Sequence, residues 1–232
     1  MIMPAVKKSS LVIALLAIAA VADAQTAEAA GRVRAAGTRT TASGQTVSGH
    51  VAGGTTAAGQ AAVRGGATVT GANGTTHYSG GAVAGPSGVA GRKGSTTYAT
   101  DGSVQHSGSS GWKGVNGGSG SGSNTATRNA DGSASSSHQN SGQTAAGGSY
   151  SSNGAYARDA SGNVTGSSQT SASGAKGAYN SSTSSANGST THATNATNAT
   201  TGNSYNGQTT YSNGQITHSG TCKNAAGDVI QC

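Results

Sequence analysis

The sequence predicts an all-β repeat protein, made either of tandem hairpins or of a solenoid-like stack. Three observations support this prediction: turn dipeptides recur at a period near 30, β-prone residues flank them, and large apolar side chains are scarce. Gly/Ser/Thr/Asn-rich segments would then connect the hairpins. The same low complexity also leaves room for substantial disorder.

The chain begins with a pattern typical of a secretory signal peptide over residues 1–24. Lys7 and Lys8 precede an apolar run over residues 11–21, and the small residues Ala22 and Ala24 follow it. This order of a basic region, a short apolar region and a small-x-small site predicts cleavage before Gln25. We therefore expect an exported chain, located outside the cell, on its surface or in the periplasm. No second apolar stretch follows, so no membrane span is expected after cleavage.

The composition after residue 24 excludes a thick hydrophobic core. This part has no Leu, Met or Phe but holds all 40 Gly, and its large apolar residues are eleven Val, two Ile, seven Tyr and one Trp. Ordering a residue costs about 1–2 kcal/mol, and so few apolar side chains cannot offset that cost by burial alone. Without Lys7, Lys8 and Asp23, the 13 basic and 6 acidic residues fall to 11 and 5, a net charge of +6. Because disorder is favoured by high net charge, this sparse charge favours a thin β architecture over a solvated tail.

The repeat is visible in the turn dipeptides of residues 43–221. Flanking sequences agree, as in STTYATDGSVQHSG (95–108) and TTYSNGQITHSG (209–220). Asn-Gly and Asp-Gly accept positive φ at both positions, so they predict hairpins with type I′ turns. The acids beside these turns are predicted to support the turns and not catalysis, because none neighbours another in sequence. The turn glycines are Gly44, Gly74, Gly102, Gly132, Gly162, Gly188 and Gly214, and the acids are Asp101, Asp131, Asp159 and Asp228.

Some of these units resemble the YD or RHS-type repeat, in which a Tyr precedes a polar turn ending in Gly and a short β run. YARDASGNVT (156–165) is the most similar segment, and YATDG (98–102) and YSNGQI (211–216) match more loosely. The resemblance covers about a third of the chain. It implies a secreted or surface β-sheet protein, of the kind found in shells or adhesive stalks, and it transfers no functional residue.

Six histidines follow the repeat glycines by three to six residues: His50, His77, His106, His138, His192 and His218. Offsets of four and six place side chains on the same face of a strand, so stacked units are predicted to align histidines in a stripe. One interpretation is a metal-binding or pH-sensitive stripe. The favoured interpretation is a polar strand residue copied by repeat duplication, because no Cys or paired carboxylate accompanies it.

Glycine recurs at every third residue over 85–94 and again over 108–120. Collagen needs this spacing together with abundant proline, and only Pro86 lies in these runs. We therefore interpret both runs as extended connectors between hairpins. Trp112 lies in the second run, where it is predicted either to stack on a sugar or to pack into a small cluster.

Cys222 and Cys232 enclose a turn at the end of the chain. In an exported protein this spacing predicts a disulfide that closes a C-terminal hairpin over residues 222–232. Such a bond would protect the last repeat from fraying, as terminal repeats require.

Residues 25–42 are predicted to form a basic, flexible arm. Arg32, Arg34 and Arg39 lie in it, and they are candidates for binding acidic polysaccharide or another extracellular polyanion. No aromatic residues interleave with them, so specific nucleic-acid recognition is not predicted.

The sequence predicts no enzyme and no cofactor or metal requirement. It contains no Gly-x-Ser-x-Gly, no Gly-Lys-Ser/Thr phosphate loop and no His-Glu-x-x-His. Three hypotheses remain: a secreted structural or adhesive repeat protein that self-associates, a binding module for extracellular polyanions, and a disordered exported spacer.

Overall fold

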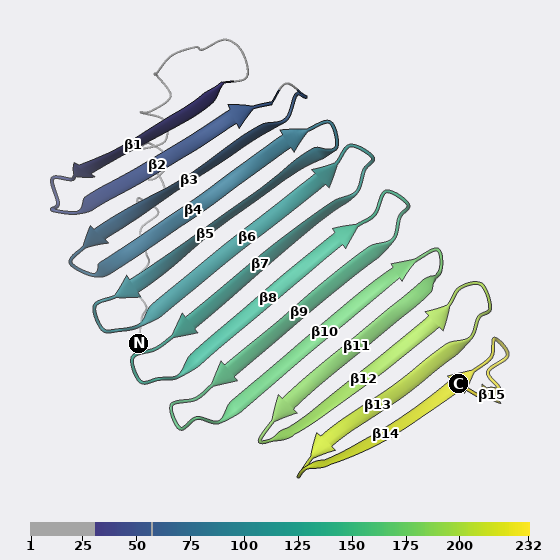
Figure 1. The fold of residues 1–232 in the computed structure, drawn as a ribbon. Helices are drawn as coiled ribbons and strands as arrows, with labels where there is room; N and C mark the ends of the chain where they lie inside the picture. Colours follow the sequence, from purple (N-terminus) through teal and green to yellow (C-terminus); the bar gives the residue numbers. More distant parts are fainter. Residues whose placement is uncertain (1–30, 57) are drawn as a thin grey trace.

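The chain forms a single antiparallel sheet of 15 strands, arranged in the order of the sequence (Figure 1). The structure is a computed structural model that describes residues 31–56 and 58–232. The all-β prediction is confirmed, as tandem hairpins in one open sheet and not as a solenoid. The expected signal peptide, residues 1–24, lies outside the described residues.

Fourteen of the strands are nine to twelve residues long, and the last has two. Their bounds are β1 Arg32–Thr40, β2 Thr46–Thr55, β3 Ala61–Gly71, β4 Gly74–Gly85, β5 Gly88–Ala99, β6 Val104–Gly114, β7 Ser119–Arg128, β8 Ala134–Gln143, β9 Ser149–Arg158, β10 Val164–Gly174, β11 Gly177–Ala186, β12 Ser189–Asn198, β13 Ser204–Ser212, β14 Gln215–Lys223 and β15 Val229–Ile230.

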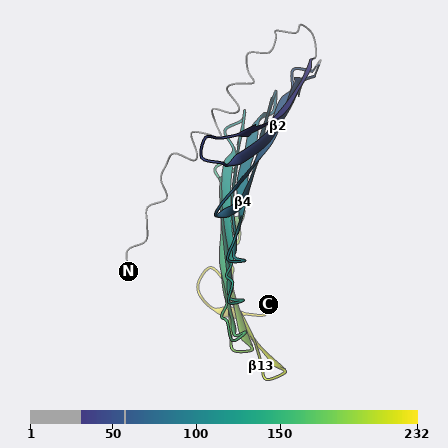
Figure 2. The ribbon, with the colours of Figure 1, turned by 90° about the vertical axis from the view of Figure 1, so that its left-hand side faces the viewer.

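The sheet is one layer thick, as the view along its plane shows (Figure 2). No hydrophobic side chain in the described part of the chain is buried. The chain exposes 15930 Å² of accessible surface, whereas a compact protein of 22.0 kDa exposes about 9000 Å². Backbone hydrogen bonds between neighbouring strands therefore hold the fold, and both faces of the sheet are open.

Most connections between strands use one turn design. In the β7–β8 turn, Asn129 N–H donates to the Ser133 carbonyl at 2.9 Å, and the Asn129 carbonyl accepts from Gly132 N–H at 3.1 Å. Gly132 has φ +85°. This is the three-residue hairpin loop in which a positive-φ glycine forms a bulge after a tight turn.

The prediction of type I′ turns is correct at two places and wrong at the Asp-Gly pairs and at Asn73-Gly74, where Asn73 lacks positive φ and Gly74 already pairs with Gly71. Asn187 and Asn213 have φ +51° and precede positive-φ glycines, as a type I′ turn requires. At Asp101-Gly102 and Asp131-Gly132 only the glycine has positive φ. There the carboxylate instead accepts a backbone hydrogen bond two residues ahead, which stabilises the three-residue loop.

The interpretation of the glycine triplets as connectors is wrong. Residues 88–94 lie in β5 and residues 108–114 in β6, and both strands are paired along their whole length. Gly88, the first residue of β5, and Gly117, between β6 and β7, have positive φ and belong to turns on the side of the sheet opposite to Gly102 and Gly132. The period of 30 residues therefore spans two strands and two turns. The repeat recognised in the sequence included only the turns at one end of the strands.

The basic arm predicted over residues 25–42 is not a flexible arm in its described part. Arg32–Thr40 form β1, which pairs with β2 over nine residues. The alternating Val and Arg side chains suit an edge strand, since charge on an edge strand discourages unwanted pairing. Residues 25–30 lie outside the described residues.

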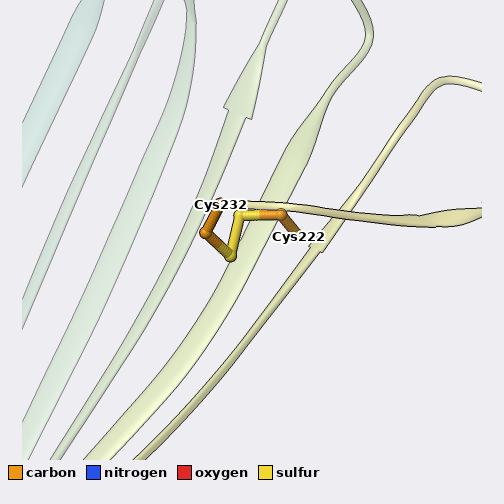
Figure 3. The surroundings of a disulfide bond; sticks show 2 residues. All are labelled: Cys222 and Cys232. Carbon is orange, nitrogen blue, oxygen red and sulfur yellow. A yellow bond between two sulfur atoms is a disulfide. The ribbon is translucent and has the colours of Figure 1, made fainter.

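The predicted disulfide between Cys222 and Cys232 is confirmed (Figure 3). Their Cα atoms are 5.3 Å apart. The bond closes the last hairpin, where β15 pairs with the end of β14. Closing so short a loop contributes about 3 kcal/mol, which holds a two-residue strand that would otherwise fray.

Candidate functional site

The strand register divides the side chains between two faces of different chemistry. Residues that are opposite each other on neighbouring strands share a face, and so do residues two apart on one strand. We call the face that carries Trp112 the aromatic face, and the other the opposite face. Following the register from strand to strand assigns every strand residue to one of the two.

Almost all rings and most arginines lie on the aromatic face. Of the seven tyrosines only Tyr78 lies on the opposite face, and all six histidines lie on the aromatic face. Its aromatic and arginine residues are Trp112, Tyr98, Tyr150, Tyr156, Tyr179, Tyr205, Tyr211, Arg32, Arg34, Arg64, Arg92, Arg128 and Arg158.

Four of these rings form one row across the strands. Trp112 on β6 is opposite Gly120, and the same register line passes through Tyr150, Tyr179 and Tyr205 on β9, β11 and β13. Ala172 and Ala196 occupy this line on the strands between the tyrosines. The row therefore presents one tyrosine ring at every second strand.

Three of the four rings lie over glycines of the neighbouring strands. A Cβ at Gly118 would be 3.3 Å from the Trp112 ring, and a Cβ at Gly220 would be 3.0 Å from the Tyr205 ring. The Tyr150 ring covers Gly142 in the same way. Gly118 and Gly142 are two of the three buried residues in the described part of the chain, although Trp112 and Tyr150 remain 43% and 42% exposed. One side of each ring thus rests on bare backbone and leaves the rest open to solvent.

Arginines form a second row next to the aromatic row. Arg34, Arg64 and Arg92 lie on one register line, on β1, β3 and β5. All three side chains are exposed. This line is two residues along the strands from the line of Trp112. The guanidinium groups therefore extend the aromatic row toward β1, the N-terminal edge strand of the sheet.

The predicted polyanion site Arg32, Arg34 and Arg39 is divided by the sheet. Arg32 and Arg34 lie on the aromatic face, and Arg39 lies on the opposite face because it is an odd number of residues away on the same strand. The three side chains therefore do not form one patch. Arg64 and Arg92, which sequence reasoning did not include, join Arg34 instead.

The histidines lie in two neighbouring lines of the aromatic face. His50, His138, His192 and His218 share one line, and His77 and His106 share the next. The odd offset of His77 still reaches this face, because the β3–β4 connection is a two-residue loop in which Gly74 already pairs with Gly71. The predicted alignment on one face is thus seen in the register.

Four histidines are tied to a threonine on the adjacent strand. The Nδ1 atoms of His77, His106, His192 and His218 each lie 2.8 Å from the hydroxyl oxygen of their cross-strand threonine. Successive histidines of a line are at least two strands apart, about 9.6 Å. No group of three metal-binding side chains occurs within residues 31–56 and 58–232. The threonine bonds are contacts that polar strand residues make, and they involve four of the six histidines.

The opposite face has two parts. Over β7–β14 it carries mainly Ser, Thr, Asn, Gln and Ala, with cross-strand hydroxyl pairs such as Ser151–Ser171 at 2.7 Å. Over β1–β5 it carries a valine patch, consisting of Val33, Val47, Val51, Val63, Val69 and Val89. Val33, Val63 and Val89 are 49%, 49% and 54% exposed. This patch is a β-branched apolar surface on an otherwise polar sheet.

The acidic residues of the described chain lie in turns and not on either face. Hydrogen bonds from the Ser133 side chain, and then from its backbone N–H, lower the pKa of Asp131. The corresponding groups of Ser103 and Asn163 lower the pKa of Asp101 and of Asp159. These hydrogen bonds favour the ionised form of each carboxylate. They also tie the carboxylate to its turn, which is the role predicted for these residues.

We expect acid to loosen these three turns. Because the folded-state pKa is lowered, the stabilisation is present above the ordinary Asp pKa of about 4 and is lost as the pH falls through the lower folded value. NMR titration of the backbone amides of Ser103, Ser133 and Asn163 measures this. Their shifts should follow midpoints below that of an unstructured Asp peptide, and the Asp131→Asn variant should abolish the shift at Ser133. Midpoints equal to the peptide value would contradict the turn role.

Comparison with known proteins identifies no relative. No protein-family model, curated protein or solved structure matches the chain. The resemblance to YD or RHS-type repeats therefore stays a prediction. No helix formed by the described residues has the length and apolar character needed to cross a membrane.

Proposed function

We propose that this chain is a secreted, non-enzymatic structural or adhesive protein of the cell surface or extracellular matrix, whose copies associate through the valine patch. The observation that carries the proposal is a sheet without a core on which six of the valines gather on one exposed surface. Apolar surface of this kind on a water-soluble protein marks an interaction site. The export signal expected over residues 1–24 and the disulfide support an extracellular location.

The size of the valine patch suits a second copy of the same chain. Five strands about 4.8 Å apart and about ten residues long cover roughly 800 Å², which is about what one partner buries in a stable complex. Two such surfaces packed face to face, with their sheets about 10 Å apart, give a β-sandwich core mainly of Val and Ala, on a face that also carries Arg39, Tyr78 and Lys93. The edges favour this mode over edge-to-edge growth, because β1 carries three arginines and β15 covers part of β14.

Sedimentation of the protein after residue 24 tests the proposal. We expect a dimer or larger species at micromolar concentration, and a monomer for Val33→Lys, Val63→Lys and Val89→Lys combined, because buried unpaired charges oppose packing. The matched control places three lysines on the aromatic face, at Val83, Val104 and Val164, and should leave association intact. Equal loss in both variants, or a wild-type monomer at every concentration, contradicts the proposal.

A second candidate function, binding of extracellular polyanions, is favoured by the arginines of the aromatic face. The described part of that face carries six arginines and no acidic residue.

A further inference from the structure

The arginine row and the aromatic row together form a continuous track across the sheet. The arginines occupy β1, β3 and β5, and the rings of Trp112, Tyr150, Tyr179 and Tyr205 occupy β6, β9, β11 and β13. The track runs perpendicular to the strands and crosses nearly the full width of the sheet shown in Figure 1. A ligand that follows it must be long, extended and repetitive.

The repeat length of the track selects the ligand. Arg34, Arg64 and Arg92 are two strands apart, and so are Tyr150, Tyr179 and Tyr205, a spacing of about 9.6 Å. In a β-1,4-linked polysaccharide each pyranose is turned over relative to the last, so the same ring face recurs at every second sugar. That two-sugar repeat has close to the same length. One side chain of the track can therefore meet each repeat of such a chain.

The exposed rings suit the apolar faces of sugars. Trp112, Tyr150 and Tyr205 rest on glycine backbone, and the rings of Trp112 and Tyr150 are exposed while that of Tyr205 is half-buried. Ala172 and Ala196 between the tyrosines add no bulk that would lift a ligand off the sheet. Aromatic side chains with one apolar side available and a polar hydroxyl are suited to such stacking.

The charge of the track selects an acidic polymer. Guanidinium groups bind carboxylates through paired hydrogen bonds. The acids of the described chain lie in turns at the strand ends, as Asp101 and Asp131 do, and none lies on the aromatic face itself. A carboxylate at each repeat of a polymer would therefore meet an arginine at each step over β1–β5.

We infer that this track binds an extended β-1,4-linked polysaccharide that carries uronic acid groups, laid across the strands of the aromatic face. The inference rests on the second candidate function, for which it names the ligand class, and shares with the proposed structural role only the extracellular setting. The two are tested by different readouts, because association through the valine patch leaves the aromatic face free.

Affinity electrophoresis and calorimetry with polymannuronate test the inference. Cellohexaose serves as the neutral β-1,4 probe, and linear polyphosphate as an anion without sugar rings. The track variants are R34A/R64A/R92A and Y150A/Y179A/Y205A. The matched controls are R39A/K93A/K113A, which removes the same charge from the opposite face, and Y98A/Y156A/Y211A, which removes tyrosines of the aromatic face outside the row. Amide exchange of each variant verifies that the sheet is retained.

We expect polymannuronate to bind the wild type. The affinity of each track variant for polymannuronate should be lower by roughly tenfold or more. The controls should stay within about threefold, because they remove charge or rings away from the track. Cellohexaose binding should depend on the tyrosine row alone. Equal losses in the two arginine variants would show binding by net charge and overturn the inference. So would an unchanged affinity in Y150A/Y179A/Y205A, or polyphosphate bound as tightly as polymannuronate.

Discussion

We expect Gly88→Ala to separate β5 from β6, and Gly102→Ala to leave the sheet intact. Both glycines have positive φ, +137° and +85°, which costs an alanine about 1–2 kcal/mol. They differ in their surroundings. A Cβ at Gly88 would collide with the carbonyl oxygen of Lys113 and lie 2.8 Å from the Cα of Gly114, whereas a Cβ at Gly102 meets nothing within 4 Å. The obstacle at Gly88 is backbone, which cannot rotate away as a side chain can.

Amide exchange and thermal unfolding measure this difference. Gly88→Ala should speed the exchange of amides in Val104–Gly114 and lower the unfolding temperature well beyond the effect of Gly102→Ala. Gly177→Ala provides an independent second case, because its Cβ would collide with the Thr197 carbonyl oxygen. If all three variants melt alike, the tight contact between these turns and the next strand is not a feature of the folded protein.

Deleting residues 133–162 should shorten the sheet without disturbing it, whereas deleting residues 133–147 should turn over every strand that follows. The longer deletion removes two strands and joins Gly132 to Asn163, which restores a turn of the same design. The shorter one removes a single strand. β9 then pairs with β7 in place of β8. Its residues that lay on the opposite face now lie on the aromatic face, and the reverse, because the register is shifted by an odd number of residues. Tyrosines and arginines would be divided between the two sides of the sheet.

Engineered disulfides measure the register in each deletion. In the longer deletion Thr127→Cys and Thr165→Cys become opposite neighbours and should form a bond, although they lie about 14 Å apart in the full chain. In the shorter deletion Ala126→Cys and Ser151→Cys should form the bond instead. These two residues lie on different faces of the full sheet, so the full-length control should stay reduced. A bond in the wrong deletion, or in neither, would contradict the assigned register.

Local sequence features predicted the repeat because each turn is built from residues next to one another. Asn-Gly and Asp-Gly marked the turns of one edge, and the Cys pair marked the end of the sheet. Most turns on the other side were missed, because the pairs Ser87-Gly88 and Asn116-Gly117 lie in glycine-rich runs that were interpreted as connectors, and turns such as that of Gly147 follow an alanine. Counting the positive-φ glycines of both edges gives the single-strand period of about 15 residues that the dipeptides alone conceal.

The candidate site was harder to predict because it depends on the register of strands far apart in sequence. The rule that offsets of four and six share a face explained five histidines, but only the two-residue loop before Gly74 brings His77 onto the same face. The same reasoning fails for Arg39, whose neighbours in sequence suggested a shared patch with Arg34. The length of each loop decides whether odd-numbered or even-numbered residues of the next strand lie on the aromatic face. The face of a distant residue therefore depends on every loop before it.

By itself the sequence determined that this protein has no thick core and predicted where many of its β-turns lie, because composition and turn residues act locally; it left a solenoid-like stack and disorder open. Only the tertiary structure decided that the hairpins join in one open layer. It also decided that Arg34, Arg64, Arg92 and the four-ring row meet on one face while the valine patch lies on the other. The physical reason is cross-strand pairing: antiparallel register, summed over fourteen connections, sets which distant side chains become neighbours.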